Sequence, residues 1–308
     1  MLSVVVPLYN EEEVISETYK RLTSVMQSIG EDYELLFIND GSRDKTALLT
    51  TEIAEKDAHV RLVCFSRNFG HQIAITAGMD FARGDAVVII DADLQDPPEV
   101  IPQMVAKWKE GYHVVYGKRI KRHGETVFKK VTAKLFYRFL QRMTQVDIPT
   151  DTGDFRLMDR KVCDTMKRIR ERNRYVRGLV SWVGFKQYAL EYVREERFAG
   201  ETKYPLKKML RLAMDGVASF SYKPLKLATL VGFILSGISF LYLVFILVQK
   251  LCGVPTAWGW TSLLAVQLFF NGVVLILLGI LGAYIGRIYE ECKERPLYIV
   301  QETIGFDE

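Results

Sequence analysis

The sequence predicts an α/β domain with a mostly parallel sheet, followed by a hairpin of two membrane-spanning helices. Over about the first 200 residues, short apolar segments typical of buried strands alternate with helical patterns, the order found in a parallel sheet with helices on its faces. Two later stretches, residues 227–249 and 261–286, contain no charged residue. Each is longer than the roughly 20 residues that a helix needs to cross a bilayer. The chain therefore divides into a water-facing part and a lipid-facing part.

The expected strands of the first part all end in polar clusters. The strand segments are LSVVVPL, YELLFIND, VRLVCFS and the β-branched run Val87–Ile90. Asn10, just after the first strand, could cap a helix that begins with three glutamates. In a parallel sheet the carboxyl ends of the strands meet at one edge, where ligands bind. Four clusters should therefore gather at that edge, namely PLYNEEE, NDGSRDKT, SRNFGH and DADLQD.

Carboxylates are concentrated where the fourth strand ends. Asp91 and Asp93, two residues apart, point roughly the same way if the chain is extended, and Gln95 follows. A divalent ion would supply the counter-charge, because Mg²⁺ takes one or two carboxylates, keeps waters and binds phosphate oxygens of a substrate. The alternative is that these acids cap a helix beginning at the next prolines, a role that fits Asp96 better than Asp93. The residues alone leave both interpretations open.

Basic residues flank the two uncharged stretches and set their expected orientation. The loop between the stretches, residues 250–260, holds one basic residue and two tryptophans suited to a membrane interface. The basic residues of the outer flanks are Lys203, Lys207, Lys208, Arg211, Lys223, Lys226, Arg287, Lys293 and Arg295. The positive-inside rule then places both termini in the cytoplasm, in an inner or plasma membrane protein. The apolar run at the N-terminus follows no basic region, so no signal peptide is expected.

These features predict four parts of the chain. We expect a cytosolic α/β domain over residues 1–203, a juxtamembrane amphipathic helix over residues 204–225, the two spans within residues 226–288 and a cytosolic tail over residues 289–308. Several glycines in the expected spans could permit close packing of helices, which leaves a homo-oligomer open.

Charge, cysteine and histidine content argue against several classes of protein. Lys and Arg number 41 against 37 Asp and Glu, and a net charge of +4 does not suggest a nucleic-acid binder. The four cysteines are far apart without a CxxC spacing, which indicates unpaired thiols in a reducing compartment. No pair of histidines has the spacing of zinc ligands. The first strand is followed by neither G-x-G-x-x-G nor a Walker lysine, so a nucleotide would not be held as in dehydrogenases or P-loop enzymes.

Four motifs carry a family resemblance. They are VVVPLYNEE, INDGSRDKT, SRNFGHQIAITAGMDFARGD and DADLQDPPE, in that order. Their order and spacing resemble those of inverting GT-A type family-two glycosyltransferases. Over nearly its whole length, both spans included, the chain is similar to polyprenyl-phosphate hexose transferases, namely dolichol-phosphate mannose synthases and bactoprenol glucosyltransferases. The resemblance implies a GT-A (Rossmann-like) fold, and the missing Q-x-x-R-W signature of processive synthases favours one sugar per event.

The resemblance also implies roles for individual residues. The implied donor nucleotide-binding residues are Pro7, Tyr9, Asn10, Glu11, Asp40, Ser42, Asp91, Arg197 and Lys203. The metal, Mg²⁺ or Mn²⁺, would bind Asp91, Asp93 and Gln95. The implied catalytic residues are Asp154 as the best match to the family's active-site acid, Asp151 as the second match, and Asp93. Most members have two acids where this chain has Asn39 and Asp40, which leaves one.

Basic residues between Gly117 and Arg142 support a lipid phosphate acceptor. This segment holds nine Lys or Arg and one Glu, and its basic residues repeat every four positions beside an apolar row, as on a helix that lies on an anionic membrane. An ordinary solvated helix is the alternative. The residues expected to bind the acceptor phosphate are Arg119, Lys129, Lys130 and Lys134.

The expected function is the transfer of a single hexose, glucose from UDP-glucose being favoured, to a polyprenyl phosphate on the cytoplasmic membrane face. A phosphate monoester with a second pKa of about 6 is mostly dianionic at neutral pH, so it can attack without a strong general base. Asp154 would then position substrates, with proton abstraction as its second candidate role. The alternatives are a different donor, such as GDP-mannose, with dolichyl or another polyprenyl phosphate, and a non-catalytic membrane carrier or flippase subunit.

Overall fold

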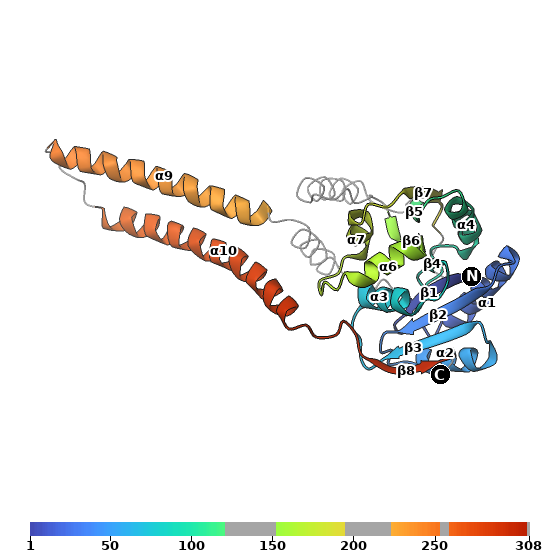
Figure 1. Cartoon of the computed structure of the whole chain (residues 1–308). Coiled ribbons are helices and arrows are strands. Elements are labelled where there is room, and N and C mark those ends of the chain that lie inside the picture. The colour runs from blue at the N-terminus through green and yellow to red at the C-terminus, as the bar shows by residue number, and fades with distance from the viewer. Residues whose placement is uncertain (121–151, 195–222, 253–258, 307–308) are drawn as a thin grey trace. The chain divides into compact units, whose positions relative to one another are not determined.

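The computed structural model describes residues 1–120, 152–194, 223–252 and 259–306. The chain forms two compact units, one made of Met1–Gly216 with Arg295–Glu308 and the other of Val217–Glu294. The first unit is an α/β domain (Figure 1). Its elements are β1 (Leu2–Leu8), α1 (Ile15–Ile29), β2 (Tyr33–Asn39), α2 (Thr46–Lys56), β3 (Val60–Phe65), α3 (His71–Phe81), β4 (Ala86–Ile89), η1 (Pro98–Val100), α4 (Ile101–Lys109), β5 (Val114–Arg119), β6 (Thr152–Asp159), α6 (Arg160–Arg168), α7 (Val176–Trp182), β7 (Gln187–Tyr192) and β8 (Val300–Ile304).

Within the described residues, one eight-stranded sheet has the strand order β7-β5-β6-β4-β1-β2-β3-β8. Four of its seven strand pairs are parallel, and the pairs β3–β8, β4–β6 and β5–β6 are antiparallel. The predicted α/β fold with a mostly parallel, GT-A-like sheet is thereby confirmed. All seven residues of β1 and of β2 are buried, as expected for strands covered on both faces.

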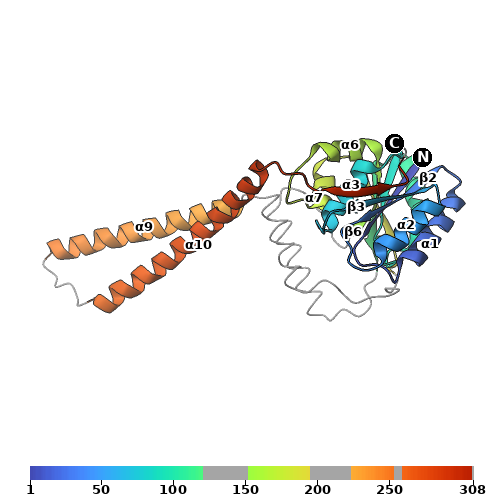
Figure 2. The same ribbon diagram turned by 90° about the horizontal axis from the view of Figure 1, so that it is seen from below.

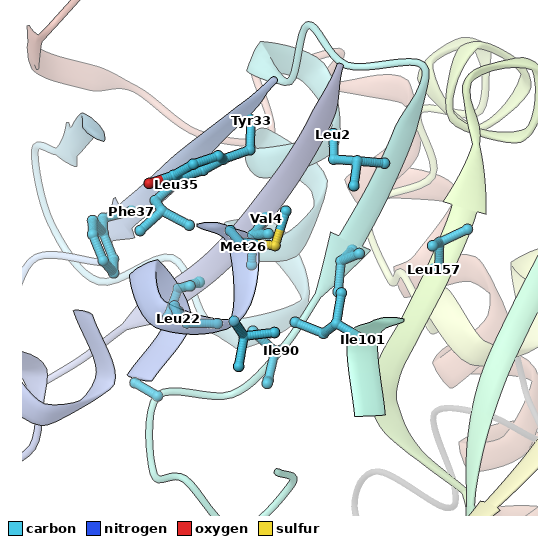
Figure 3. Close-up of a cluster of buried hydrophobic side chains, with 14 of the residues drawn as sticks. Leu2, Val4, Leu22, Met26, Tyr33, Leu35, Phe37, Ile90, Ile101 and Leu157 are labelled. Atoms are coloured by element: carbon cyan, nitrogen blue, oxygen red, sulfur yellow. The ribbon is translucent and has the colours of Figure 1, made fainter. Parts of the chain in front are cut away.

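Helices cover both faces of the sheet. Figure 2 shows α1 and α2 on one side and α3 and α6 on the other. A hydrophobic core lies under α1 and α4, where Leu22, Met26 and Ile101 pack against alternate residues of the central strands, among them Val4 and Phe37 (Figure 3). Truncating such a fully buried side chain to alanine typically costs about 2–5 kcal/mol. The core therefore holds the carboxyl ends of the central strands in fixed positions.

The strand β8 comes from the C-terminal tail and joins the α/β sheet at its edge. It pairs with β3 in antiparallel register, and Ser66 N–H donates to Ile299 O at 3.0 Å. Tyr298 stacks on Phe65 with ring centroids 5.1 Å apart, and its hydroxyl donates to Asp80 Oδ2 at 2.9 Å. Residues 289–308 are predicted only as a tail. Its part from Arg295 onward belongs structurally to the α/β domain, whereas its first residues continue α10 to Cys292.

The second unit contains two long helices, α9 (Lys223–Leu251) and α10 (Trp260–Cys292), which pack against each other. Within the described residues, one helical segment, Phe269–Cys292, is long and apolar enough to cross a membrane, with a mean hydropathy of 2.1. The apolar segment of α9, Thr229–Tyr242, is shorter. The two uncharged stretches lie inside these helices, but two complete spans stay a prediction.

Candidate active site

The topology places a ligand site at the carboxyl ends of β1 and β4. The chain passes from β1 to β2 and β3 on one side, whereas β4 lies on the other side of β1, so the strand order reverses between β1 and β4. Ligands of open α/β sheets bind beyond the strand ends at such a switch point. Pro7 lies in β1, the exposed Tyr9 follows this strand, and Asp91 follows β4.

The loops after β1 and β2 are tied together at this edge. Asn10 N–H donates to Ser42 Oγ at 3.0 Å, and Asn10 Oδ1 accepts from Arg43 N–H at 2.8 Å. Glu11 N–H donates to the hydroxyl of the first residue of α2 at 2.8 Å. The prediction that Asn10 caps a helix is wrong, because α1 begins at Ile15 and Asn10 has a left-handed φ of 55°. Its amide instead joins two loops that were both predicted to contact the nucleotide.

Asp40 is buried and bonded to the loop that precedes α3. Its Oδ1 accepts from Phe69 N–H at 2.6 Å and its Oδ2 from Gly70 N–H at 2.9 Å. Burial raises the pKa of Asp40, and these two amides oppose that rise. Asp40 thus fixes the loop that leads into His71. Its predicted contact with the base or ribose stays a prediction.

His71 lies between the carboxylates of Asp91 and Asp154. Its Nε2 is 3.2 Å from Asp154 Oδ2 and 3.5 Å from Asp91 Oδ1. The antiparallel register of β4 and β6, which pairs Ile89 with Arg156, brings Asp91 opposite Asp154 when continued by two residues. Burial lowers the pKa of His71, but the two carboxylates outweigh this effect and raise the pKa to about 9. The imidazole is therefore a cation at neutral pH and joins the two carboxylates.

Asp91 is the less satisfied of the two carboxylates. Its Oδ1 is buried and accepts no hydrogen bond from the described residues, and burial raises the pKa of this carboxyl to about 6 against the opposing effect of His71. Asp93 Oδ1 accepts from Gln95 N–H at 3.1 Å in the turn that follows. No group of three or more His, Cys, Asp or Glu side chains placed to hold a metal occurs in the described ranges. Because Mg²⁺ needs only one or two carboxylates besides water and phosphate, Asp91 and Asp93 fit such an ion.

Asp154 is the more satisfied carboxylate. Arg177 donates from Nε to Oδ1 at 2.8 Å and from Nη2 to Oδ2 at 3.0 Å, and Gln72 Nε2 donates to Oδ2 at 3.3 Å. Burial would raise the pKa of Asp154, but Arg177 and His71 hold it well below the usual value. Asp154 is therefore an anion throughout the neutral pH range, which favours a positioning role over proton abstraction.

Another buried carboxylate, Asp96, lies beside the start of β6. Arg119 Nη2 is 3.3 Å from its Oδ2, Arg194 Nε is 3.4 Å from its Oδ1, and the Tyr192 hydroxyl donates to Oδ1. Burial lowers the pKa of Arg119, but Asp96 outweighs this effect and raises it. The alternative that the acids after β4 cap the next helix is wrong, because neither η1 nor α4 has a side-chain cap. The predicted contact of Arg119 with the acceptor phosphate stays a prediction.

Several predicted site residues cannot be placed. Those outside the described residues are Lys129, Lys130, Lys134, Asp151, Arg197 and Lys203. Conversely, Gln72 and Arg177 are both bonded to Asp154, although neither is among the predicted site residues. Gln72 follows the SRNFGH cluster and opens a helix at the sheet edge, a signal that could have found it. Arg177 belongs to no motif in the sequence, so only its contact with Asp154 reveals it.

The fold and site define the class of protein: an α/β domain with a carboxylate-rich edge at the switch point of a mostly parallel sheet. The model of the family described as "Glycosyl transferase family 2" matches residues 3–166, which is more than half of the chain. The chain belongs to glycosyl transferase family 2, as the motif resemblance predicts.

Three relatives cover nearly the whole chain. An uncharacterized glycosyltransferase, YkcC, of Bacillus subtilis is 63% identical over 99% of this chain and 94% of its own length. The SfII prophage-derived bactoprenol glucosyl transferase of Shigella flexneri is 43% identical over 98% of each chain. The prophage bactoprenol glucosyl transferase homolog of Escherichia coli is 41% identical over 98% of this chain and 99% of its own. The similarity thus extends beyond the catalytic domain to the C-terminal helices and tail.

Proposed function

We propose that this chain transfers a single hexose, with glucose from UDP-glucose as the first candidate donor, to polyprenyl (undecaprenyl) phosphate on the cytoplasmic membrane face. The observation that carries the proposal is the 41–43% identity over nearly the full length to proteins named bactoprenol glucosyl transferase. The anionic edge at Asp91, bridged by His71 to Asp154, supports a donor site at the switch point. The product would serve later glycosylation of cell-surface glycans.

On the donor side, Asp91, Asp93 and Gln95 would hold Mg²⁺ or Mn²⁺. When bound, such an ion would neutralise charge on the donor diphosphate and make it a better leaving group. The protein's own part is to present the carboxylates from a rigid strand end, with His71 fixing the orientation of Asp91 at 3.5 Å. Asp40 holds the adjoining loop through Phe69 and Gly70.

On the acceptor side, the phosphate monoester would attack the anomeric carbon with inversion. With a second pKa of about 6 it is mostly dianionic at neutral pH, so no strong base is required. The protein must instead offset the repulsion between the acceptor phosphate and the donor diphosphate. Cationic side chains can do so by electrostatic stabilisation. Arg119 and the predicted lysines Lys129, Lys130 and Lys134 would serve this purpose, and Asp154 would position the reacting groups.

Membrane attachment would come from α9 and α10 as two spans with both termini in the cytoplasm. The exposed side chains of both helices are largely apolar, for example Phe240 at 64% and Leu275 at 68% of full exposure. Large exposed apolar surfaces of this kind mark contact with lipid or protein. This attachment would keep the acceptor lipid and the catalytic domain on one membrane face.

A transfer assay with a panel of radiolabelled donors tests the proposal. Full-length protein in detergent would receive UDP-glucose, GDP-mannose or a UDP-amino sugar, each with undecaprenyl phosphate and Mg²⁺ or Mn²⁺. We expect label from UDP-glucose in the lipid extract, one UDP released for each sugar transferred, and a product of inverted anomeric configuration.

Two other outcomes have definite meanings. Transfer from GDP-mannose alone would keep the class of reaction and replace the donor. Neither lipid labelling nor release of nucleoside diphosphate with any donor would favour a carrier or flippase subunit and overturn the proposed function.

A further inference from the structure

Arg177 binds the carboxylate of Asp154 through two parallel hydrogen bonds. Its Nε and Nη2 donate to the two carboxylate oxygens at 2.8 and 3.0 Å, and its Nη1 donates to Thr152 O at 3.1 Å. The planar guanidinium matches a carboxylate in this way, whereas a lysine ammonium cannot. Arg177 lies in the first turn of α7, so this helix is joined to the start of β6 at the active-site edge.

Gln72 makes the complementary connection from α3. Its Nε2 donates to Asp154 Oδ2 at 3.3 Å, and its Oε1 accepts from Val176 N–H at 2.9 Å. One amide side chain thus joins the first turn of α3, the carboxylate of Asp154 and the N-terminus of α7. His71, its neighbour in the chain, approaches the same oxygen at 3.2 Å. Asp154 is held by residues from two helix N-termini at once.

These contacts leave little capacity for a proton on Asp154. Oδ2 accepts from Arg177, Gln72 and His71, while Oδ1 accepts from Arg177 and lies 3.8 Å from Arg156 Nη2. A carboxylate has about four lone-pair sites, and it receives four hydrogen bonds here, two of them from Arg177, while Arg156 lies too far away for one. Arg177 is paired with Asp154 at 2.8 Å and compensates the charge of this carboxylate. An approaching dianionic phosphate would therefore meet less repulsion than from an unpaired Asp154.

We propose that Arg177 and Gln72 are positioning residues for sugar transfer, acting through Asp154, which they hold as a fixed and charge-compensated anion. This inference rests on the proposed function. It assigns neither residue a contact with substrate. Their contribution is to set the direction of the Asp154 carboxylate and to cancel its repulsion of the acceptor phosphate.

The test compares kcat and KM of full-length variants in detergent with undecaprenyl phosphate and UDP-glucose. Arg177→Gln should lower kcat about 10- to 100-fold, as loss of a partner that orients a functional ligand does. Because Arg177 acts through Asp154, the double variant Arg177→Gln with Asp154→Asn should be within about twofold of the slower single variant. Arg177→Lys keeps the positive charge but cannot donate the two parallel hydrogen bonds, so its kcat should lie between those of Arg177→Gln and the wild type. KM for UDP-glucose should change less than kcat.

A matched control is available in another arginine that pairs with a carboxylate of α3. Arg170 pairs with Asp80 at 2.8 Å, the same distance, but at the far end of α3 and with a half-exposed guanidinium. Arg170→Gln should therefore leave kcat unchanged. Thermal unfolding of each variant identifies any that fail to fold. If Arg177→Gln does not fold, Gln72→Met, which keeps volume and removes both hydrogen bonds, should still lower kcat about 10-fold.

The failures of the two proposals are distinguishable. Absence of transfer by the wild-type protein would overturn the proposed function. Normal transfer by the wild type, combined with a wild-type kcat in folded Arg177→Gln or Gln72→Met, would overturn this inference. Multiplicative losses in the double variant would also overturn it, because they would mean that Arg177 acts independently of Asp154.

Discussion

Asp91 at the end of β4 and Asp154 at the start of β6 lie opposite each other and contact the same histidine, but their surroundings differ. Asp91 has a buried oxygen without a hydrogen-bond partner among the described residues, and burial raises its pKa to about 6. Asp154 is bonded by Arg177, Gln72 and His71, and its pKa lies well below the usual value. The pKa values of two identical side chains at one sheet edge are therefore shifted in opposite directions.

The difference arises from the helices packed beside each carboxylate. The N-termini of α3 and α7 bring an amide and a guanidinium to Asp154, whereas Asp91 receives from α3 only the shared imidazole at 3.5 Å. The imidazole offsets only part of the desolvation of Asp91, because the pKa of this carboxyl stays raised, and a second cation would stabilise its charged form. Asp91 is thus suited to recruit a cation from solution, and Asp154 already has its cations from the protein. Pairs of acids whose pKa values are driven apart in this way commonly divide the tasks of an active site.

The largest effect is expected from removing the charge of Asp91. Asp91→Asn should lower transfer by about 10³-fold or more, because a stabilising ion near the donor diphosphate would lose its ligand. The same change should leave the thermal unfolding midpoint in EDTA unchanged or higher, because it removes a carboxylate whose charged form is disfavoured by desolvation. Transfer assays and thermal unfolding measure the two effects separately. Asp93→Ala should also abolish metal-dependent transfer.

Asp85 supplies the control for this change. It precedes β4 at the opposite end of the strand and is paired with the N-terminal amine, with its side chain 73% exposed. Asp85→Asn should therefore affect neither quantity measurably. Full wild-type transfer in EDTA would contradict the metal role of Asp91 and Asp93.

A smaller loss of transfer, about 10²-fold, is expected for Asp154→Asn. Asparagine keeps part of the hydrogen bonding of a positioning residue, so residual transfer should exceed that of Asp154→Ala and should still rise with pH near the acceptor's pKa of about 6. If Asp154 were a general base, the two variants would be equally inactive. Rates of both variants between pH 5 and 8 decide the matter.

Stability should respond to Asp154 in the direction opposite to Asp91. Since the folded-state pKa of Asp154 is depressed, its contribution is fully present above the ordinary pKa of about 4 and is lost as pH falls through the folded value. Asp154→Asn should thus be less stable than the wild type at pH 7, and the difference should shrink below about pH 4. Urea unfolding at several pH values measures this. A constant difference down to pH 2 would contradict the assignment.

Much of the sheet and of the donor edge could be predicted because their signals are local. Alternation of apolar strands and helices predicts β1 to β4, and the rule that ligands bind at strand ends predicts that the Asn10, Asp40 and Asp91 clusters share one edge. The family motifs predict Asp154. These predictions depend on short stretches of sequence, namely apolar runs, the polar residues that follow them and the family motifs.

The parts that sequence could not predict depend on long-range packing. Arg177 is 23 residues from Asp154, and Gln72 is 82 residues away, so no local pattern joins them. The strand β8 belongs to a polar tail after a long apolar helix and pairs with β3 about 240 residues earlier, for example Ile304 with Leu62. Its residues, VQETI, resemble a solvated segment because an edge strand leaves most of its side chains exposed.

A third test asks whether Asp96 behaves like Asp154 or like Asp91. A Cβ at Gly153 would lie 2.5 Å from Arg119 Nη2, so Gly153→Ala must shift the guanidinium that pairs with Asp96. We expect a stability loss of about 1–3 kcal/mol from overpacking and a fall in transfer of about 10-fold from misplacement at the site. The control is Gly237→Ala in α9, where nothing lies within 4 Å of the added methyl. Unchanged stability and transfer would mean that the Arg119–Asp96 pair is dispensable, unlike the pairs of Asp154.

The smallest effect should come from the other end of α3, where Asp80 is held by the tail. Its Oδ2 accepts from the Tyr298 hydroxyl at 2.9 Å and pairs with Arg170 at 2.8 Å. Tyr298→Phe removes one hydrogen bond and keeps the stacking on Phe65, so stability should fall by roughly 1 kcal/mol and the unfolding midpoint by about 2–4 °C. The transfer rate should not change, because His71 and Gln72 at the first turn of α3 are fixed by their own contacts with Asp154. A lower kcat with a normal unfolding midpoint would mean instead that the tail controls the position of α3, and that the order around Asp154 depends on the whole helix and not on its N-terminus alone.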